Sequence, residues 1–212
     1  MAKRRLSGAG ANPSMSIQYS ERLSDWKLWE NKADELLKAA KLLEPHVREY
    51  WNTVTTNFEE GRYSDPLKTP HTPPSNPQSA YFMLVAYALK NLLKAIIIRH
   101  RQNDLRGRLF RKLPGVVKTH NLRDLAKEAN VPVTVDEEDL LHRLCWQSTW
   151  AGRYPIPVEA SALKSVETYS DGKSYLTACF YPSDADHITD LLKRVKTLIP
   201  DEPNTAEDPA SQ

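Results

Sequence analysis

The apolar residues between Ser24 and Phe58 recur every three or four positions, which is the period of one face of an α-helix. The first set predicts a helix over 24–40: Trp26, Trp29, Ala33, Leu36, Leu37 and Ala40. A second set follows Pro45 and keeps the period: Val47, Tyr50, Trp51, Val54 and Phe58. Because proline is tolerated in the first turn of a helix, we expect Pro45 to begin a second helix that pairs with the first.

Five prolines stand in the segment 61–78, GRYSDPLKTPHTPPSNPQ. Each proline lacks a backbone N–H and fixes φ, so this density forbids a helix and disfavours a sheet. We expect a long, partly extended loop that connects two helices. Recognition of this proline-rich segment by a partner is the alternative.

The segment 79–98 is apolar on nearly every side, which predicts a buried central helix with Ser79 as a candidate cap. Only Lys90, Asn91 and Lys94 interrupt the apolar run. A lysine on such a helix needs a route to solvent or an acidic partner. We expect both lysines to form salt bridges.

Three more helices are predicted in the remaining chain. Leu122 and Leu125 mark one face of a helix that Asn121 or Thr119 caps, and Thr134 and Glu137 form a capping box ahead of another. The last helix is expected to begin near Ser183. The pair Asp171–Gly172 suits a tight turn, so we expect either a short hairpin or an irregular insertion near 165–181. The predicted fold class is therefore all-α, an antiparallel helical bundle of about five to six helices.

The length and composition favour one domain with flexible ends. The chain has 212 residues, 40% of them hydrophobic, which suits a single core over 21–200. Residues 1–20 and the acidic tail 201–212 are poor in large apolar groups, so we expect both to be disordered. The N-terminus lacks the apolar stretch of a signal peptide, and no uninterrupted apolar run reaches the roughly 20 residues of a membrane span. We expect a cytoplasmic protein that does not enter a membrane.

The cysteine and histidine content gives no support for a metal site. Cys145 and Cys179 are too few for a disulfide framework or a zinc site, and we expect both to be reduced thiols. His142 and Cys145 share a helical face, but Leu141 and Leu144 beside them indicate packing. We expect no metal and no cofactor.

Positive charge is concentrated in the segment 99–112, within a chain whose net charge is only +2. This segment has six bases against one acid, Asp104: Arg99, Arg101, Arg106, Arg108, Arg111 and Lys112. Clustered cations displace counterions from a nucleic-acid backbone, and the single aromatic residue Phe110 offers a surface for base stacking. We expect Arg101, Arg106, Arg108, Arg111 and Lys112 to contact RNA. A solvated cap on the central helix is the alternative, since cations suit a helix C-terminus.

The order of several segments resembles the HEPN family (higher eukaryotes and prokaryotes nucleotide-binding). The resemblance covers about 79–158 and the final helix. Its most specific pieces are His120-Asn121-Leu122 and Trp150-Ala151-Gly152-Arg153-Tyr154-Pro155. Membership would imply a compact helical bundle that often dimerises, with frequent links to RNA cleavage, toxin–antitoxin pairs or antiviral defence.

The sequence departs from the family's ribonuclease motif, an arginine followed after four to six residues by a histidine. None of the six histidines has an arginine at the corresponding upstream positions. That pair would supply the proton-transfer group and the cation that stabilises the transition state. The departure argues against nuclease activity.

Three functions remain open. The first is a non-catalytic HEPN-like binding module that acts as a homodimer or with a partner protein and contacts RNA through 99–112. In this function, the aromatic segments 50–51 and 146–150 provide the apolar surface for dimerisation. The second is a divergent, metal-independent endoribonuclease with a composite site at a dimer interface, built from Arg99, His100, His120 and Arg153. The third is a nucleotide-binding or regulatory subunit. For His120 a capping role, and for Arg153 a bond to the last carbonyls of a helix, are the structural alternatives.

Overall fold

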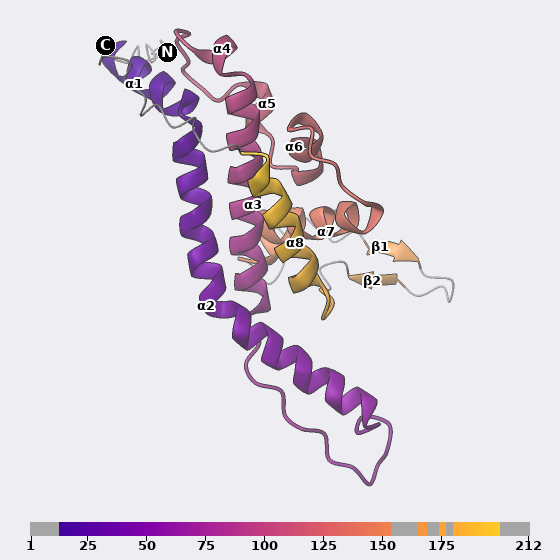
Figure 1. Ribbon diagram of the computed structural model, residues 1–212. Helices are drawn as coiled ribbons and strands as arrows, with labels where there is room; N and C mark the ends of the chain where they lie inside the picture. Colours follow the sequence, from indigo (N-terminus) through magenta and orange to yellow (C-terminus); the bar gives the residue numbers. More distant parts are fainter. Residues whose placement is uncertain (1–12, 154–164, 169–173, 177–179, 200–212) are drawn as a thin grey trace, which may run out of the picture.

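The computed structural model describes residues 13–153, 165–168, 174–176 and 180–199. The described chain is helical apart from two short strands and the loops (Figure 1). In chain order the elements are α1 (Pro13–Ser24), α2 (Trp26–Glu59), α3 (Gln78–His100), α4 (Gln102–Leu105), α5 (Gly115–Lys118), α6 (Leu122–Glu128), α7 (Val135–Trp146), a π-helix (Gln147–Ala151), β1 (Ser165–Thr168), β2 (Ser174–Leu176) and α8 (Asp184–Thr197). The predicted all-α class is confirmed.

Helix α3 forms the centre of the protein. It contacts α2 along its length, and α6, α7, α8 and the π-helix pack on its other sides (Figure 1). Its apolar residues are almost completely buried, as the sequence predicted. By length and composition α3 is the one described helix that could cross a membrane, but 78% of its apolar window is buried inside the protein.

Helix α2 is a single helix, so the prediction of two helices divided at Pro45 is wrong. Proline inside a helix removes one hydrogen bond and clashes with the preceding turn, and the ribbon bends about midway along α2 (Figure 1). The helix continues because its core-facing side extends past the proline: Trp26, Ala33, Ala40 and Val47, each seven positions apart, are all buried. The small alanines let α2 lie close against α3, and this packing offsets the defect at Pro45.

The end of α2 and the proline-rich loop form an arm that projects from the body (Figure 1). The segment 61–78 is a loop up to the start of α3, as expected. Asn57, which is fully buried, clamps this loop: its Nδ2 donates to the carbonyl of His71 (2.7 Å), and the N–H of His71 donates to its Oδ1 (2.8 Å). The middle of the loop is therefore bonded to the C-terminal end of α2.

The disordered N-terminal tail was predicted to span residues 1–20. This range is too long, because α1 begins at Pro13. Ser16 and Ser20 are buried, and the Ser20 hydroxyl accepts a hydrogen bond from the N–H of Phe110 (2.7 Å). These small polar side chains allow α1 to pack on the segment after α4. The tail over 201–212 lies outside the described residues.

The C-terminal half is held by caps and by one buried ion pair. Asn121 caps α6, and Thr134 with Glu137 forms the predicted capping box of α7. Arg143 on α7 donates through both terminal nitrogens to Asp184, the first residue of α8, whose carboxylate is 2% exposed. The N–H of Tyr181 donates to the same carboxylate (2.6 Å). This pair fixes α8 against α7.

Strands β1 and β2 pair antiparallel, with an irregularity in register between Ser165 and Glu167. The hairpin is the first of the two alternatives expected near 165–181. The pair Asp171–Gly172, predicted to make its turn, lies outside the described residues.

Candidate nucleic-acid interface

The basic turn comprises residues 101–113, between the end of α3 and α5. Leu105 is buried, and Phe110 and Leu113 pack against the core. The residues between these anchors face solvent, so the apolar spacing displays the charged side chains. Gly107 has φ 76, a left-handed conformation that side-chain-bearing residues rarely adopt, and it reverses the chain at the tip.

Two cations of the segment 99–112 have structural partners. The guanidinium of Arg99 lies over the ring of Trp26, 4.6 Å from its centroid. Arg101 forms an ion pair with Glu128 at the end of α6. Two of the six cations thus have partners within the chain, and RNA contact by Arg101 stays a prediction.

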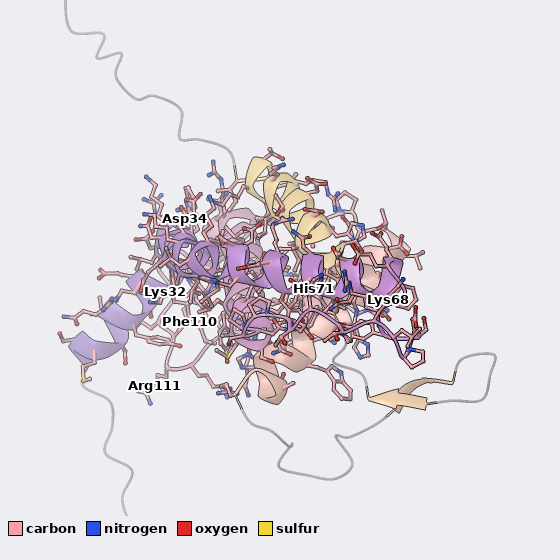
Figure 2. The ribbon with its side chains drawn as sticks, turned by 90° about the horizontal axis from the view of Figure 1, so that it is seen from below. Lys32, Asp34, Lys68, His71, Phe110 and Arg111 are labelled. Atoms are coloured by element: carbon pink, nitrogen blue, oxygen red, sulfur yellow. The ribbon has the colours of Figure 1, made fainter. Side chains whose placement is uncertain are left out.

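The other four cations are exposed, and no acidic partner lies within ion-pair distance of them in the described part of the chain. They are Arg106, Arg108, Arg111 and Lys112. Figure 2 shows Arg111 at the margin of the molecule, on the other side from Lys68 of the proline-rich loop. Their charge is therefore directed to solvent.

Phe110, which the sequence suggested as a stacking surface, is only partly exposed. Its ring is half-buried against the core, and its N–H is bonded to Ser20. The neighbouring Leu109 is instead 70% exposed. The missed signal was the spacing of Leu105, Phe110 and Leu113, which marks Phe110 as an anchor.

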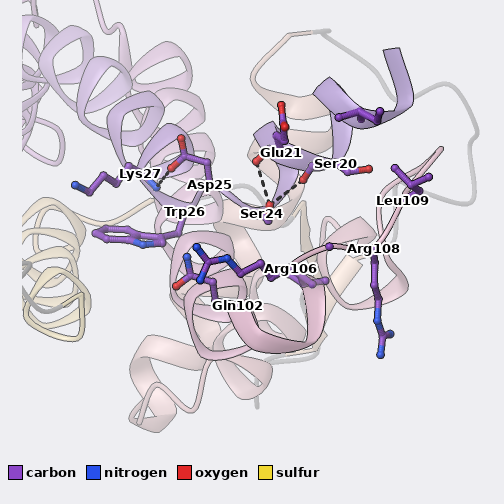
Figure 3. A pocket seen from close by; sticks show the side chains of 13 residues that line it. Ser20, Glu21, Ser24, Asp25, Trp26, Lys27, Gln102, Arg106, Arg108 and Leu109 are labelled. Atoms are coloured by element: carbon purple, nitrogen blue, oxygen red, sulfur yellow. Dashed lines mark hydrogen bonds between the residues drawn. The ribbon is translucent and has the colours of Figure 1, made fainter. Parts of the chain in front are cut away.

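A pocket of about 540 Å³ lies between the basic turn, α1 and the start of α2 (Figure 3). Arg106 extends into it toward Trp26 and Gln102, whereas Arg108 points away from them (Figure 3). Its wall also contains Glu21, Asp25 and Ser24. The pocket thus combines cationic side chains with amide, hydroxyl and carboxylate groups.

The second polar cluster lies on α3, where Lys90 and Lys94 are only 6% and 4% exposed. The Nζ of Lys90 donates to the Ser148 hydroxyl (3.2 Å) and lies 5.1 Å from the centroid of the Tyr87 ring. The Nζ of Lys94 lies 5.5 Å from the centroid of the Trp29 ring. Neither lysine forms a salt bridge with any described residue, so the predicted salt bridges are wrong. Their partners come from residues far along the chain, which the periodicity of α3 does not identify.

The charges around the two lysines are positive. Burial lowers the pKa of Lys94 to about 8, and the charge of Lys90 adds to this effect. Burial lowers the pKa of Lys90 as well; Cys145 opposes the shift and Arg153 reinforces it. Partial burial and then the charges of both lysines lower the pKa of His120. No carboxylate of the described residues contributes to any of these shifts.

The π-helix after α7 builds one wall of this cluster. The N–H of Gly152 donates to the carbonyl of Gln147 (3.0 Å), five residues back, and a Cβ at Gly152 would lie 2.8 Å from that of Met83 on α3. This close approach places Ser148 beside Lys90, and Tyr87 donates from its hydroxyl to the Ser148 carbonyl (2.9 Å). π-Helical turns often occur at functional sites.

The four candidate catalytic residues fall into two separate groups. His120 and Arg153 lie near Lys90, and Arg153 donates to the carbonyl of Thr149, the structural role left open for it. Arg99 and His100 end α3, about 14 Å further along the helix at 1.5 Å per residue. One chain therefore does not bring all four together.

No group of three or more histidine, cysteine and acidic residues is placed to hold a metal ion within the described ranges. His142 accepts a hydrogen bond from the indole of Trp146 (3.2 Å), and Cys145 is a free thiol next to the His120 carbonyl. Cys179 lies outside the described residues.

Comparison with protein-family models, curated proteins and solved structures gave no match to this chain.

Proposed function

We propose that the protein is a HEPN-like helical module that binds RNA through its basic turn, without cleaving it, as a homodimer or with a partner protein. The observation that carries the proposal is the exposure of Arg106, Arg108, Arg111 and Lys112 without acidic partners in the described residues. Contacts from such side chains to phosphates release counterions, which gives affinity independent of sequence. A role in a toxin–antitoxin or defence system belongs to the same proposal through the HEPN resemblance.

The neighbouring pocket favours single-stranded RNA. An exposed base has hydrogen-bonding edges that suit the carboxylate of Asp25, the amide of Gln102 and the hydroxyl of Ser24, and all three line the pocket. Arg106 reaches into the same pocket beside them (Figure 3). Bases in a duplex are stacked and paired, so their edges would not enter it.

The test replaces Arg106, Arg108, Arg111 and Lys112 with glutamine together. We expect weaker binding of a labelled single-stranded RNA, with the slope of log affinity against log salt reduced by about 0.7 for each lost phosphate contact. The free energy of unfolding should change by roughly 0–1 kcal/mol, because exposed cations contribute little to stability.

The matched control replaces four exposed lysines elsewhere, Lys38, Lys41, Lys118 and Lys127, with glutamine. This variant undergoes the same change in net charge, so it separates a local contact from a global effect. An unchanged salt slope in the basic-turn variant, or equal losses in both variants, would refute the proposal.

A divergent endoribonuclease is the second candidate, favoured by the grouping of His120 and Arg153 around Lys90. Its composite site would require Arg99 and His100 from a second copy. The same labelled RNA reports cleavage, which His120→Ala with Arg153→Ala should abolish if this candidate is correct.

The surface proposed for dimerisation has to be changed. Tyr50, Trp51 and Trp146 are half-buried, and the side chain of Trp150 lies outside the described residues. The arm instead exposes Phe58 at 77% and Leu67 at 93%, and Leu42, midway along α2, is 76% exposed. Sedimentation over a range of concentrations checks the dimer, and a constant mass of one chain would exclude it.

A further inference from the structure

We propose that Lys90 and Lys94 form the floor of a binding site for a small doubly charged oxyanion of the phosphate class. This inference does not depend on RNA binding by the basic turn, because the two clusters use different residues and different elements. The site lies where α3, the loop before α6 and the π-helix meet.

The ammonium groups of Lys90 and Lys94 have unfilled hydrogen bonds within the described chain. An ammonium group has three N–H donors and no acceptor. Within the described chain, Lys90 has one acceptor, the Ser148 hydroxyl, and Lys94 has only the ring of Trp29. Both side chains are more than nine-tenths buried. An oxyanion has several acceptor oxygens and would satisfy donors of both groups.

The positive charge of Lys90 and Lys94 is not balanced within the described chain. The two lysines stand four residues apart on one helix, where like charges repel. Arg153 adds further positive charge near Lys90, and no carboxylate among the described residues shifts the pKa of Lys90 or Lys94. A buried charge is stable when an opposite charge pairs with it. A dianion would supply this missing charge, whereas a cation or a neutral ligand would not.

The site has an exposed edge, because His120 and Arg153 are exposed and both interact electrostatically with Lys90. The flanking groups are suited to a phosphate: Ser148 contributes a hydroxyl, and an exposed histidine and arginine stand at the rim. The other buried side chains of α3 are apolar or aromatic, which limits the ligand to a small head group.

The test measures the thermal midpoint of the full chain at pH 7 against inorganic phosphate, with sodium chloride keeping the ionic strength constant. A ligand that binds only the folded state raises the midpoint in a saturable manner. We expect this response in the wild type, in Lys38→Met and in the basic-turn glutamine variant. Lys90→Met and Lys94→Met should lose it.

A parallel titration with glycerol 3-phosphate distinguishes free phosphate from a phosphate ester as the natural source. A response to either ligand that depends on both lysines supports the site, and the ligand with the larger response identifies the source. No response of the wild type to either ligand, or a response that persists in Lys90→Met and Lys94→Met, would overturn the inference. Both variants replace a buried charge with an apolar chain of similar length, so misfolding is not the expected cause of a lost response.

Discussion

Two regions of the interior bury cations in opposite ways. Arg143 meets the carboxylate of Asp184 through two hydrogen bonds, and the same carboxylate accepts the N–H of Tyr181. Lys90 and Lys94 are as deeply buried, yet their described partners are a hydroxyl group and aromatic rings. The first arrangement is complete within the chain and holds α7 to α8. The second is incomplete, which is typical of a position retained for a ligand at some cost in stability.

The largest effect is expected from breaking the complete arrangement. In Asp184→Asn, Arg143 keeps its burial but loses its main counter-charge, and removing one partner of a buried pair costs about 3–5 kcal/mol. The neighbouring Asp139 also pairs with Arg143, so the loss in the free energy of unfolding should be limited to about 3 kcal/mol. Unfolding in denaturant measures this change.

The control for that variant is Asp190→Asn. Asp190 pairs with Lys193 on the exposed face of α8, where both side chains are 73% exposed. Its loss should change the free energy of unfolding by no more than about 1 kcal/mol. Equal effects of the two substitutions would show that the Arg143–Asp184 pair is no stronger than a surface pair.

A smaller effect of opposite sign is expected from the incomplete arrangement. Without phosphate, Lys94→Met should stabilise the protein at pH 7 by about 1–3 kcal/mol, because it removes a buried charge that has no acidic partner in the described chain. Lys38→Met, on the exposed face of α2, should change stability by less than about 0.5 kcal/mol. Destabilisation by Lys94→Met would mean that its ammonium is better satisfied than the contacts show.

The pH dependence sharpens the same prediction. Because the pKa of Lys94 falls from 10.5 to about 8 on folding, the unfolded state binds more protons between these values. Stability should therefore rise as the pH increases above 8. Burial raises the pKa of Tyr81 to about 12, so unfolding is favoured by tyrosine ionisation above pH 10, and the useful window ends there. Lys94→Met should flatten this rise in stability with pH. Parallel profiles of stability against pH in the wild type and in Lys94→Met would contradict the assignment of the rise to Lys94.

The sequence predicted features that depend on near neighbours. The cap at Asn121 and the capping box of Thr134 and Glu137 involve residues no more than three positions apart, and both are present. The central helix was equally clear, because its apolar run is long. These features can be predicted because the residues that form them are close neighbours along the chain.

The errors concern contacts between distant segments. The helix through Pro45 is maintained by packing on α3, and Lys90 meets Ser148 from 58 residues away. In the basic turn, the charge pattern identified four exposed cations correctly. It gave no indication that Arg101 pairs with Glu128, 27 residues later, or that Arg99 lies over Trp26.

The clamp at Asn57 gives the protein a natural place for variation in length. The bonds between Asn57 and His71 close the intervening chain into a ring, and the position of α3 is fixed by the buried residues of α2 rather than by that ring. The entropy of closing a loop grows only slowly with its length. Extra residues inserted between Asp65 and Thr69 would enlarge the ring while the start of α3 stays where it is, so an epitope or a reporter domain could be carried there without disturbing the helical core.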